Sequence, residues 1–110
     1  MSNPATKTRK EAFLDVLFHG LRVTDAALNA DAALVLSQLS VDAVRRLVLV
    51  AARRKSKVPH RLRALTVIQR IGRLSGPDDL MDLTILAADS NEHIRAAAGR
   101  CLATCPIAVP

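Results

Sequence analysis

The chain has 110 residues, of which half are apolar and only two are aromatic, and its formal net charge at pH 7 is +6. This length suits one domain with a hydrophobic core, and no apolar run approaches the roughly 20 residues that span a membrane. Helix-forming residues dominate and no stretch alternates with period two. The composition therefore predicts an all-α fold and argues against a membrane-spanning protein.

Residues 1–8 are predicted to form a flexible N-terminus. The N-terminal stretch over residues 1–13 is basic, but it lacks the long apolar core and the cleavage site of a signal peptide. The two cysteines, Cys101 and Cys105, lie four residues apart on one predicted helix, where disulfide geometry is poor. We therefore expect buried thiols in a reducing, cytoplasmic protein, and no metal site, because His93 lies two turns away from them.

The first predicted helix covers residues 9 to about 19. The Thr8-Arg9-Lys10-Glu11 segment matches a capping box at its start, and Gly20 is expected to be its C-cap. Because no earlier repeat packs on this helix, Phe13 and Phe18 are expected to cover an exposed end of the core. The alternative is that the two rings form a knob that binds a partner.

The second predicted helix is capped by Thr24-Asp25 and continues to Leu39, although residues 29–31 could divide it into two helices. Ser40 is then expected to be the N-cap of a third helix over residues 41 to about 55. This helix ends in basic residues, which the negative end of the helix dipole favours. Its expected core residues are Val44, Leu47, Val48, Val50, Ala51 and Ala52.

The fourth predicted helix has Pro59 in its first turn and ends in the Ser75-Gly76-Pro77 turn. Pro77 also opens the fifth helix. In the polar turn that follows the fifth helix, Asp89 with Glu92 resembles a capping box, and Ser90 is a competing N-cap.

The sixth predicted helix ends at Pro106 and has small and apolar residues at the spacing of one helix face. This stripe, which we expect to be buried, consists of Ile94, Ala97, Ala98, Cys101, Leu102 and Cys105.

The two helices over residues 78–105 resemble a HEAT-like (armadillo-type) helical repeat, with an apolar first helix, an acidic turn and an apolar-Arg-x-x-Ala start to the second helix. The residues that carry this resemblance are Leu83, Leu86, Asp89, Ile94, Arg95, Ala97, Ala98 and Leu102. It implies an α-α superhelix of about three HEAT-like hairpins, as a single domain over residues 9–105 with a tail at 106–110. It also implies that Asp89 and Arg95 are structural, because such residues form a hydrogen-bond ladder between repeats in this family.

An internal alignment agrees with a repeat. Residues 62–64 align with residues 94–96 at an offset of 32. Arg63 therefore aligns with Arg95, and we expect it to take part in repeat packing. The offset is close to the ~34 residues of a tetratricopeptide repeat, but the Trp and Tyr of that signature are missing, as is the Thr-Pro-Leu-His of ankyrin repeats.

Between Ala43 and Pro77 lie ten of the sixteen Lys and Arg residues and none of the ten acidic residues, so the rest of the chain carries a net charge of −4. A cluster around residues 53–57, with His60 nearby, lies at a predicted helix–helix turn and could contact several phosphates in a salt-dependent way. No aromatic residue lies near it for base stacking. The candidates for anion or nucleic-acid binding are Arg45, Arg46, Arg53, Arg54, Lys55, Lys57, Arg61, Arg70 and Arg73.

Two other interpretations of this stretch are open. The first is a solvated surface, because helical repeats expose charged side chains. The second is a helix-turn-helix motif over residues 41–74, although the segment at residues 53–58 is long for its turn. The repeat alignment explains the same residues more economically.

Nothing in the sequence indicates catalysis. The three histidines, His19, His60 and His93, are dispersed, and the acidic residues within 78–82 suit the first turn of a helix. The sequence contains no Gly-rich phosphate loop, no Cys-x-x-Cys and no His-Glu-x-x-His. We therefore expect a protein that is not an enzyme and that needs no cofactor or metal ion.

The expected function is that of a non-catalytic protein–protein interaction module or scaffold, which binds through the concave face of the stack. The alternative is a nucleic-acid-binding protein that uses the basic stretch at residues 45–73. Three hairpins leave poorly capped ends, so self-association through an apolar end is also open. A membrane is not among the expected partners.

Overall fold

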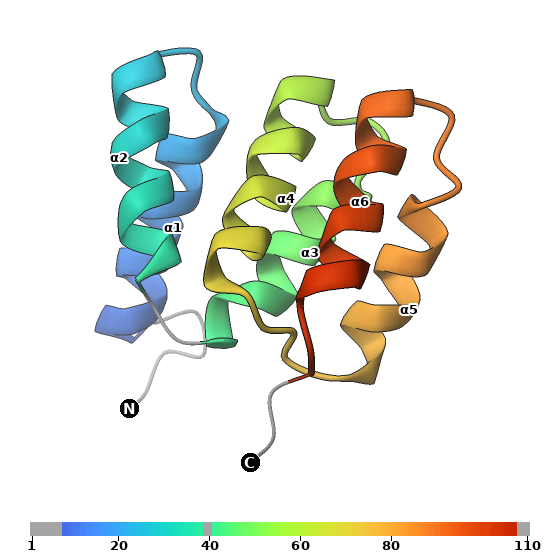
Figure 1. Ribbon diagram of the computed structural model, residues 1–110. Helices are drawn as coiled ribbons and strands as arrows, with labels where there is room; N and C mark the ends of the chain where they lie inside the picture. The colour runs from blue at the N-terminus through green and yellow to red at the C-terminus, as the bar shows by residue number, and fades with distance from the viewer. Residues whose placement is uncertain (1–7, 39–40, 108–110) are drawn as a thin grey trace, which may run out of the picture.

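The computed structural model describes residues 8–38 and 41–107. Within these ranges the fold is all-helical, as predicted, with no β-strand longer than an isolated bridge. A short 3-10 helix over Val41–Ala43 precedes the third α-helix. The six α-helices of the described residues are α1 (Arg9–Arg22), α2 (Ala26–Ser37), α3 (Val44–Ala52), α4 (Val58–Ile71), α5 (Pro77–Leu86) and α6 (Glu92–Thr104) (Figure 1).

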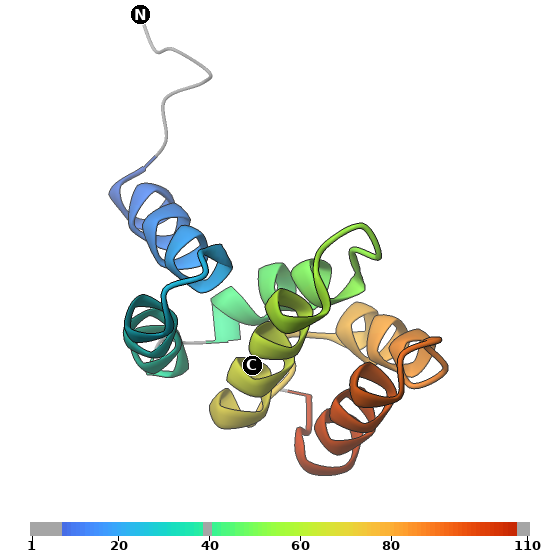
Figure 2. The ribbon, with the colours of Figure 1, turned by 90° about the horizontal axis from the view of Figure 1, so that it is seen from above.

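Consecutive helices pair as three antiparallel hairpins, α1 with α2, α3 with α4, and α5 with α6. Viewed from above, α2, α4 and α6 form one row, and α3 and α5 lie side by side in a second row with α1 beyond them (Figure 2). Helix α4 is central, because it packs against α1, α2, α3 and α6. The turns of the three hairpins consequently lie at one end of the molecule (Figure 1).

The start of α1 is capped as predicted, because the Thr8 hydroxyl accepts a hydrogen bond of 3.1 Å from the Glu11 backbone N–H. The predicted end at Gly20 is wrong, since the helix continues to Arg22. Gly20 has a packing role instead: a Cβ at this position would lie 3.1 Å from the Cβ of Ala32. The missing side chain lets α1 and α2 approach each other closely.

Helix α2 is a single helix, capped by the Asp25 carboxylate, which accepts from the backbone N–H groups of the first turn. The segment that could have divided it, residues 29–31, is helical throughout. The Asn29 side chain donates to the carbonyl oxygens of Gly20 and Val23, at 2.8 and 2.7 Å. Asn29, which the sequence suggested as a helix interruption, thus satisfies carbonyl groups at the C-terminal end of the preceding helix.

Helix α3 is shorter than predicted, because it ends at Ala52 instead of near Lys55. Arg53, Arg54 and Lys55, which were expected in its last turn, therefore lie in the α3–α4 turn. Four of the six expected core residues are fully buried, whereas Val50 and Ala52 are partly exposed. The predicted flexible N-terminus up to residue 7, the positions of Leu39 and Ser40, and the end of the tail lie outside the described residues.

Helix α4 has Pro59 in its first turn, as predicted, but it ends four residues before the predicted turn. Gly72 follows the helix with a φ of 76°, a left-handed conformation that glycine adopts without a steric penalty. The connection then runs past Leu74, whose backbone N–H donates to the Pro106 carbonyl at 2.8 Å. The segment after α6 is thereby attached to the connection between α4 and α5.

The N-cap of α6 is Asn91 and neither Asp89 nor Ser90, because the Asn91 side chain accepts from two backbone N–H groups of the first turn. The predicted stripe on this helix is otherwise confirmed. Five of its six residues are buried and face the core, and Leu102 is partly exposed. The small side chains at Ala97 and Ala98 lie where α6 packs between α4 and α5.

Several large apolar side chains do not reach the core. Phe18 is buried, but Phe13 is 49% exposed, so only one of the two rings covers the core as expected. On the neighbouring helices α3 and α5, Leu49, Met81 and Ile85 are each more than half exposed.

None of the helices in the described ranges combines the length and the apolar character needed to cross a membrane.

Candidate anion-binding site at the hairpin turns

Three arginines of the predicted basic stretch, Arg45, Arg46 and Arg61, form ion pairs with carboxylates. Arg45 donates to Asp79 at 2.9 Å and to Asp82 at 2.7 Å, which joins α3 to α5. These hydrogen bonds raise the pKa of Arg45 above its ordinary value. Asp79 is fully buried and also accepts from the backbone N–H and the hydroxyl of Ser75. Arg45 is therefore part of the contact between the second and third hairpins.

Arg46 is occupied in a different way. Its guanidinium lies 2.7 Å from the Asp15 carboxylate of α1 and 4.4 Å from the centroid of the Phe18 ring. An arginine that pairs with a carboxylate and stacks on an aromatic ring contributes to packing between helices. Arg46 is therefore not available as an anion-binding residue.

Arg61 is buried within the fold, although the sequence placed it among the anion-binding candidates. Its Nε donates to the Ala51 carbonyl at 2.8 Å, and its terminal nitrogen donates to Asp89 at the same distance. Asp89 also accepts from the Asn91 backbone N–H, and these two hydrogen bonds lower the pKa of the carboxyl. Arg61 thus links the end of α3 to the α5–α6 turn and cannot face a ligand.

Of the three residues expected in a repeat ladder, Asp89 and Arg63 contact a neighbouring hairpin, but the hydrogen bonds of Arg95 in the described residues stay within its own hairpin. Asp89 pairs with Arg61 of the preceding hairpin, whereas Arg95 donates to the carbonyls of Asp89 and Ser90 within its own turn. Arg63 donates through Nε to the Leu21 carbonyl of the first hairpin at 2.7 Å. Asp89 and Arg95 therefore tie the α5–α6 turn to a helix, and Arg63 ties α4 to the last turn of α1.

The remaining basic residues of the stretch lie at two opposite ends of the molecule. Arg70 lies in the last turn of α4, about 16 Å along the helix axis from Pro59, and Arg73 follows the end of the helix. Arg54 is exposed in the α3–α4 turn. The predicted stretch is therefore not one continuous surface, and only its residues near the α3–α4 turn gather around a hollow.

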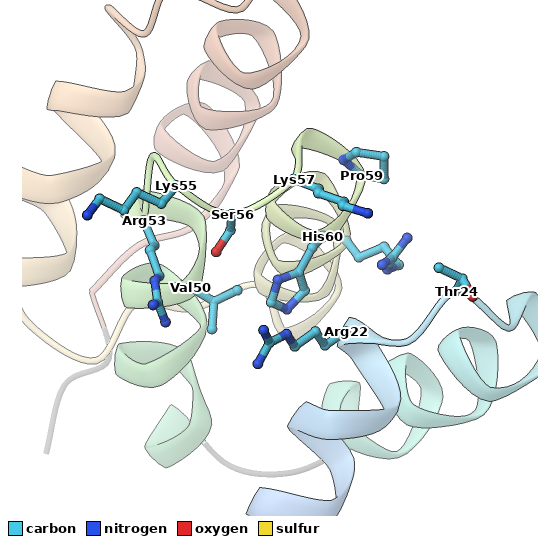
Figure 3. A pocket seen from close by; sticks show the side chains of 10 residues that line it. Arg22, Thr24, Val50, Arg53, Lys55, Ser56, Lys57, Pro59 and His60 are labelled. Carbon is cyan, nitrogen blue, oxygen red and sulfur yellow. The ribbon is translucent and has the colours of Figure 1, made fainter.

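That hollow is a pocket of about 630 Å³ between the α1–α2 turn, the α3–α4 turn and the start of α4 (Figure 3). Five of its lining residues are Lys or Arg, and none is Asp or Glu. Arg22 and His60 point toward each other, and Lys55 and Lys57 extend outward at the rim (Figure 3). The pocket is lined by Arg22, Thr24, Val50, Arg53, Lys55, Ser56, Lys57, Pro59, His60 and Arg63.

The cations of this basic pocket are not neutralised within the described part of the chain. Arg22, Arg53, Lys55 and Lys57 form no ion pair there, unlike Arg45, Arg46 and Arg61. Helix α4 begins beside the pocket with no side-chain cap and no acidic residue in its first turn. Its positive N-terminal end adds to the field of the side chains. The pocket is therefore strongly electropositive.

His60 lies among these cations. Its Nε2 atom is buried and has no hydrogen-bond partner in the described residues. Burial, followed by the charges of Arg63, Arg22 and Arg53, lowers the pKa of His60 below its ordinary value of 6.5. The imidazole is therefore neutral at pH 7 and lies where an additional positive charge is unfavourable.

Sequence reasoning found Arg53, Lys55 and Lys57 as binding candidates, with Ser56 and His60 in or beside the same cluster, but missed Arg22 and Thr24. These two residues lie on the first hairpin, outside the acid-free stretch in which the candidates were sought. A usable signal was present, because turns of adjacent antiparallel hairpins must lie at the same end of a stack. Placing the two turns together would have joined Arg22 to the residues near Lys57.

The two cysteines are free, buried thiols, as predicted. Their sulfur atoms lie 3.4 and 3.8 Å from the carbonyls of Leu65 and Ile68 on α4. Burial raises the pKa of Cys101 to about 12. In the described ranges, no three His, Cys, Asp or Glu side chains come close enough together to hold a metal ion.

Comparisons with family models, with curated proteins and with solved structures find no match to this chain. The chemistry of the site must therefore be argued from its residues. The basic pocket offers several hydrogen-bond donors and positive charge, an arrangement that binds anions.

Proposed function

We propose that the protein is a non-catalytic binding module of HEAT-like repeats, and that it binds nucleic acid through the basic pocket. Three antiparallel hairpins packed in sequence support the HEAT-like architecture. The Arg61–Asp89 ion pair supports it too, because it joins successive hairpins through an acidic turn, as in the repeat ladder of that family. We also propose a cytoplasmic location, in which the two buried thiols would stay reduced.

The proposal rests on a contrast between two groups of cations, those paired with carboxylates between helices and those that line the basic pocket. The fold pairs the arginines that lie between helices with carboxylates, yet it gathers five cationic side chains around one hollow without a carboxylate. Holding like charges together is unfavourable unless an anion compensates them. A phosphate-bearing partner would provide that compensation.

Nucleic acid suits the pocket better than an acidic peptide. Three of the five cations are arginines, whose planar guanidinium groups match phosphate oxygens through paired hydrogen bonds. The net charge of +6 adds long-range attraction for a polyanion. Because no Phe, Tyr or Trp lines the pocket, we expect contacts with phosphates and little discrimination between base sequences.

The test is a fluorescence-anisotropy titration of a labelled DNA duplex at two salt concentrations. The pocket variant is Arg53→Glu/Lys55→Glu/Lys57→Glu, and the matched control is Arg54→Glu/Arg70→Glu/Arg73→Glu, which changes the net charge equally outside the pocket. We expect the wild type and the control to bind in a salt-dependent way. The pocket variant should lose affinity, and its salt slope should fall by about 1 for each phosphate contact removed.

Two results would contradict the proposal. Equal losses in both variants would mean that net charge, and not the pocket, attracts the duplex. No binding by the wild type at low salt would leave the basic residues as a solvated surface.

A second candidate function, protein–protein binding, is favoured by the exposed apolar side chains on α3 and α5. Arg45 of α3 pairs with Asp82 of α5, and one turn farther along these neighbouring helices lie Leu49 and Ile85, both more than half exposed. Exposed apolar residues that lie together commonly mark an interface. Size-exclusion chromatography with light scattering tests self-association through this face, and a monomeric mass at high concentration would count against it.

A further inference from the structure

We infer that the basic pocket receives the terminal phosphate of a nucleic acid strand, a phosphate monoester, in preference to the phosphodiesters within the strand. This inference rests on the nucleic-acid binding proposed above and specifies the group that enters the pocket.

The shape of the site favours the end of a strand. Its walls come from the α1–α2 turn, the end of α3, the α3–α4 turn and the first turns of α4. The three arginines therefore line a hollow, with Lys55 and Lys57 at its rim, and do not form a ridge. Internal phosphates of a duplex lie on a convex backbone with a sugar on either side. A strand end can enter a hollow of about 630 Å³, a volume in the range of small-molecule pockets.

The positive charge of the site favours a phosphate monoester over a phosphodiester. A phosphodiester carries one negative charge, whereas a phosphate monoester carries about −1.5 to −2 at pH 7 and has three acceptor oxygens. The five cations and the start of α4 can compensate the larger charge. Arg63 is already oriented for this role, because the bond from its Nε to the Leu21 carbonyl fixes the guanidinium and leaves its terminal nitrogens for a ligand.

The buried Nε2 of His60 lacks a hydrogen-bond partner among the described residues. Buried polar atoms without a hydrogen bond are uncommon in folded proteins. The groups that face this imidazole are Arg22 of α1, Arg53 of the α3–α4 turn and Arg63 of α4, and all three are donors. A phosphate oxygen bound between these residues would accept a hydrogen bond from Nε2 of the neutral imidazole after a rotation of the ring that exposes this atom to the hollow.

The experiment compares short DNA duplexes of one sequence with an internal fluorophore and with either 5′-phosphate or 5′-hydroxyl ends. We expect the phosphorylated duplex to bind at least about tenfold more tightly, because several charge-assisted hydrogen bonds depend on the added phosphate. A free nucleoside 5′-monophosphate, which presents the same monoester without a strand, should compete only weakly.

His60→Gln should reduce the preference for phosphorylated ends, whereas His19→Gln, at an exposed histidine of α1, should preserve it. Arg22→Gln is a second test in an exposed residue at a helix end, and thermal unfolding establishes that each variant is folded. Reduced preference in folded His60→Gln and Arg22→Gln supports the inference.

The outcomes distinguish a failure of the terminal-phosphate inference from a failure of the proposed nucleic-acid binding. If both duplexes bind equally and the triple pocket variant loses both, nucleic-acid binding stands and the terminal-phosphate inference is wrong. If the mononucleotide competes as well as the duplex does, the pocket serves a small phosphate compound and the inference is also wrong. If neither duplex binds, the proposed function itself fails.

Discussion

At the scale of single residues, arginine side chains have two contrasting roles in this chain. Arg61 is buried against Asp89 and the Ala51 carbonyl, whereas the Arg53 side chain forms no ion pair with the described residues and lines the basic pocket. Eight residues separate them in sequence. Their different environments arise because Arg61 lies on the inward face of α4, while Arg53 lies in the turn that precedes it.

Removing one member of the Arg61–Asp89 pair should destabilise the fold strongly. We expect Asp89→Ala to cost roughly 3–5 kcal/mol of unfolding free energy, because it leaves a buried guanidinium without a counter-charge. Urea denaturation measures this cost. The double variant Arg61→Leu/Asp89→Ala should recover part of the loss, and a cost below about 1 kcal/mol for the single variant would show that water already screens the pair.

His60 should make stability depend on pH near neutrality. The folded protein holds the pKa of His60 below 6.5, so the unfolded chain binds the proton first as the pH falls. Stability is therefore fully present above about pH 6.5 and declines as the pH falls toward the folded pKa. Urea midpoints at pH 7.5 and pH 5.5 should differ less in His60→Gln than in the wild type, and His19→Gln should behave as the wild type does. An unchanged difference in His60→Gln would contradict this assignment.

At the scale of helices, small residues determine how closely neighbours pack. Gly20 allows α2 to approach α1, and the Ala97 and Ala98 positions allow α6 to approach the helices beside it. With only two aromatic residues in the chain, the core depends on this close aliphatic packing.

Ala97→Leu should overpack the contact of α6 with its neighbours. We expect a loss of about 1–3 kcal/mol, because a buried site with 5% exposure has no room for a larger side chain. The matched control is Ala96→Leu on the exposed side of the same helix, which should change the unfolding free energy little. Equal thermal stabilities for the two variants would mean that the contact tolerates the larger side chain.

At the scale of the whole molecule, the basic pocket joins two hairpins. Arg22 and Thr24 come from the first hairpin, and the other lining residues come from the second. The Arg63–Leu21 hydrogen bond crosses the same boundary. A ligand in the pocket therefore contacts both hairpins and favours the assembled fold.

Binding should consequently raise the thermal stability of the domain. With a phosphorylated duplex at 100 times its dissociation constant, we expect about 2.7 kcal/mol of added stability. Thermal unfolding followed by circular dichroism measures the shift. The Arg53→Glu/Lys55→Glu/Lys57→Glu variant should show none, and a shift of equal size in that variant would contradict binding at the pocket.

Local structure was largely predictable, and its errors have identifiable causes. The Thr8 and Asp25 caps and the Pro59 and Pro77 starts were correct, because capping involves residues within one turn. The cap of α6 was misassigned because Asp89 and Asn91 have similar capping chemistry, and the choice depends on Arg61, which lies 28 residues from Asp89 and holds its carboxylate.

The sequence by itself determined an all-helical chain, the approximate position of each helix and the buried stripe of α6. These features follow from the 3.6-residue period, from caps and from proline and glycine, all of which act over a few residues. Only the tertiary structure decided which cations are available. Pairing with a carboxylate or burial against a carbonyl depends on side chains brought together by helix packing, and the hydrophobic pattern that drives this packing does not specify charge partners.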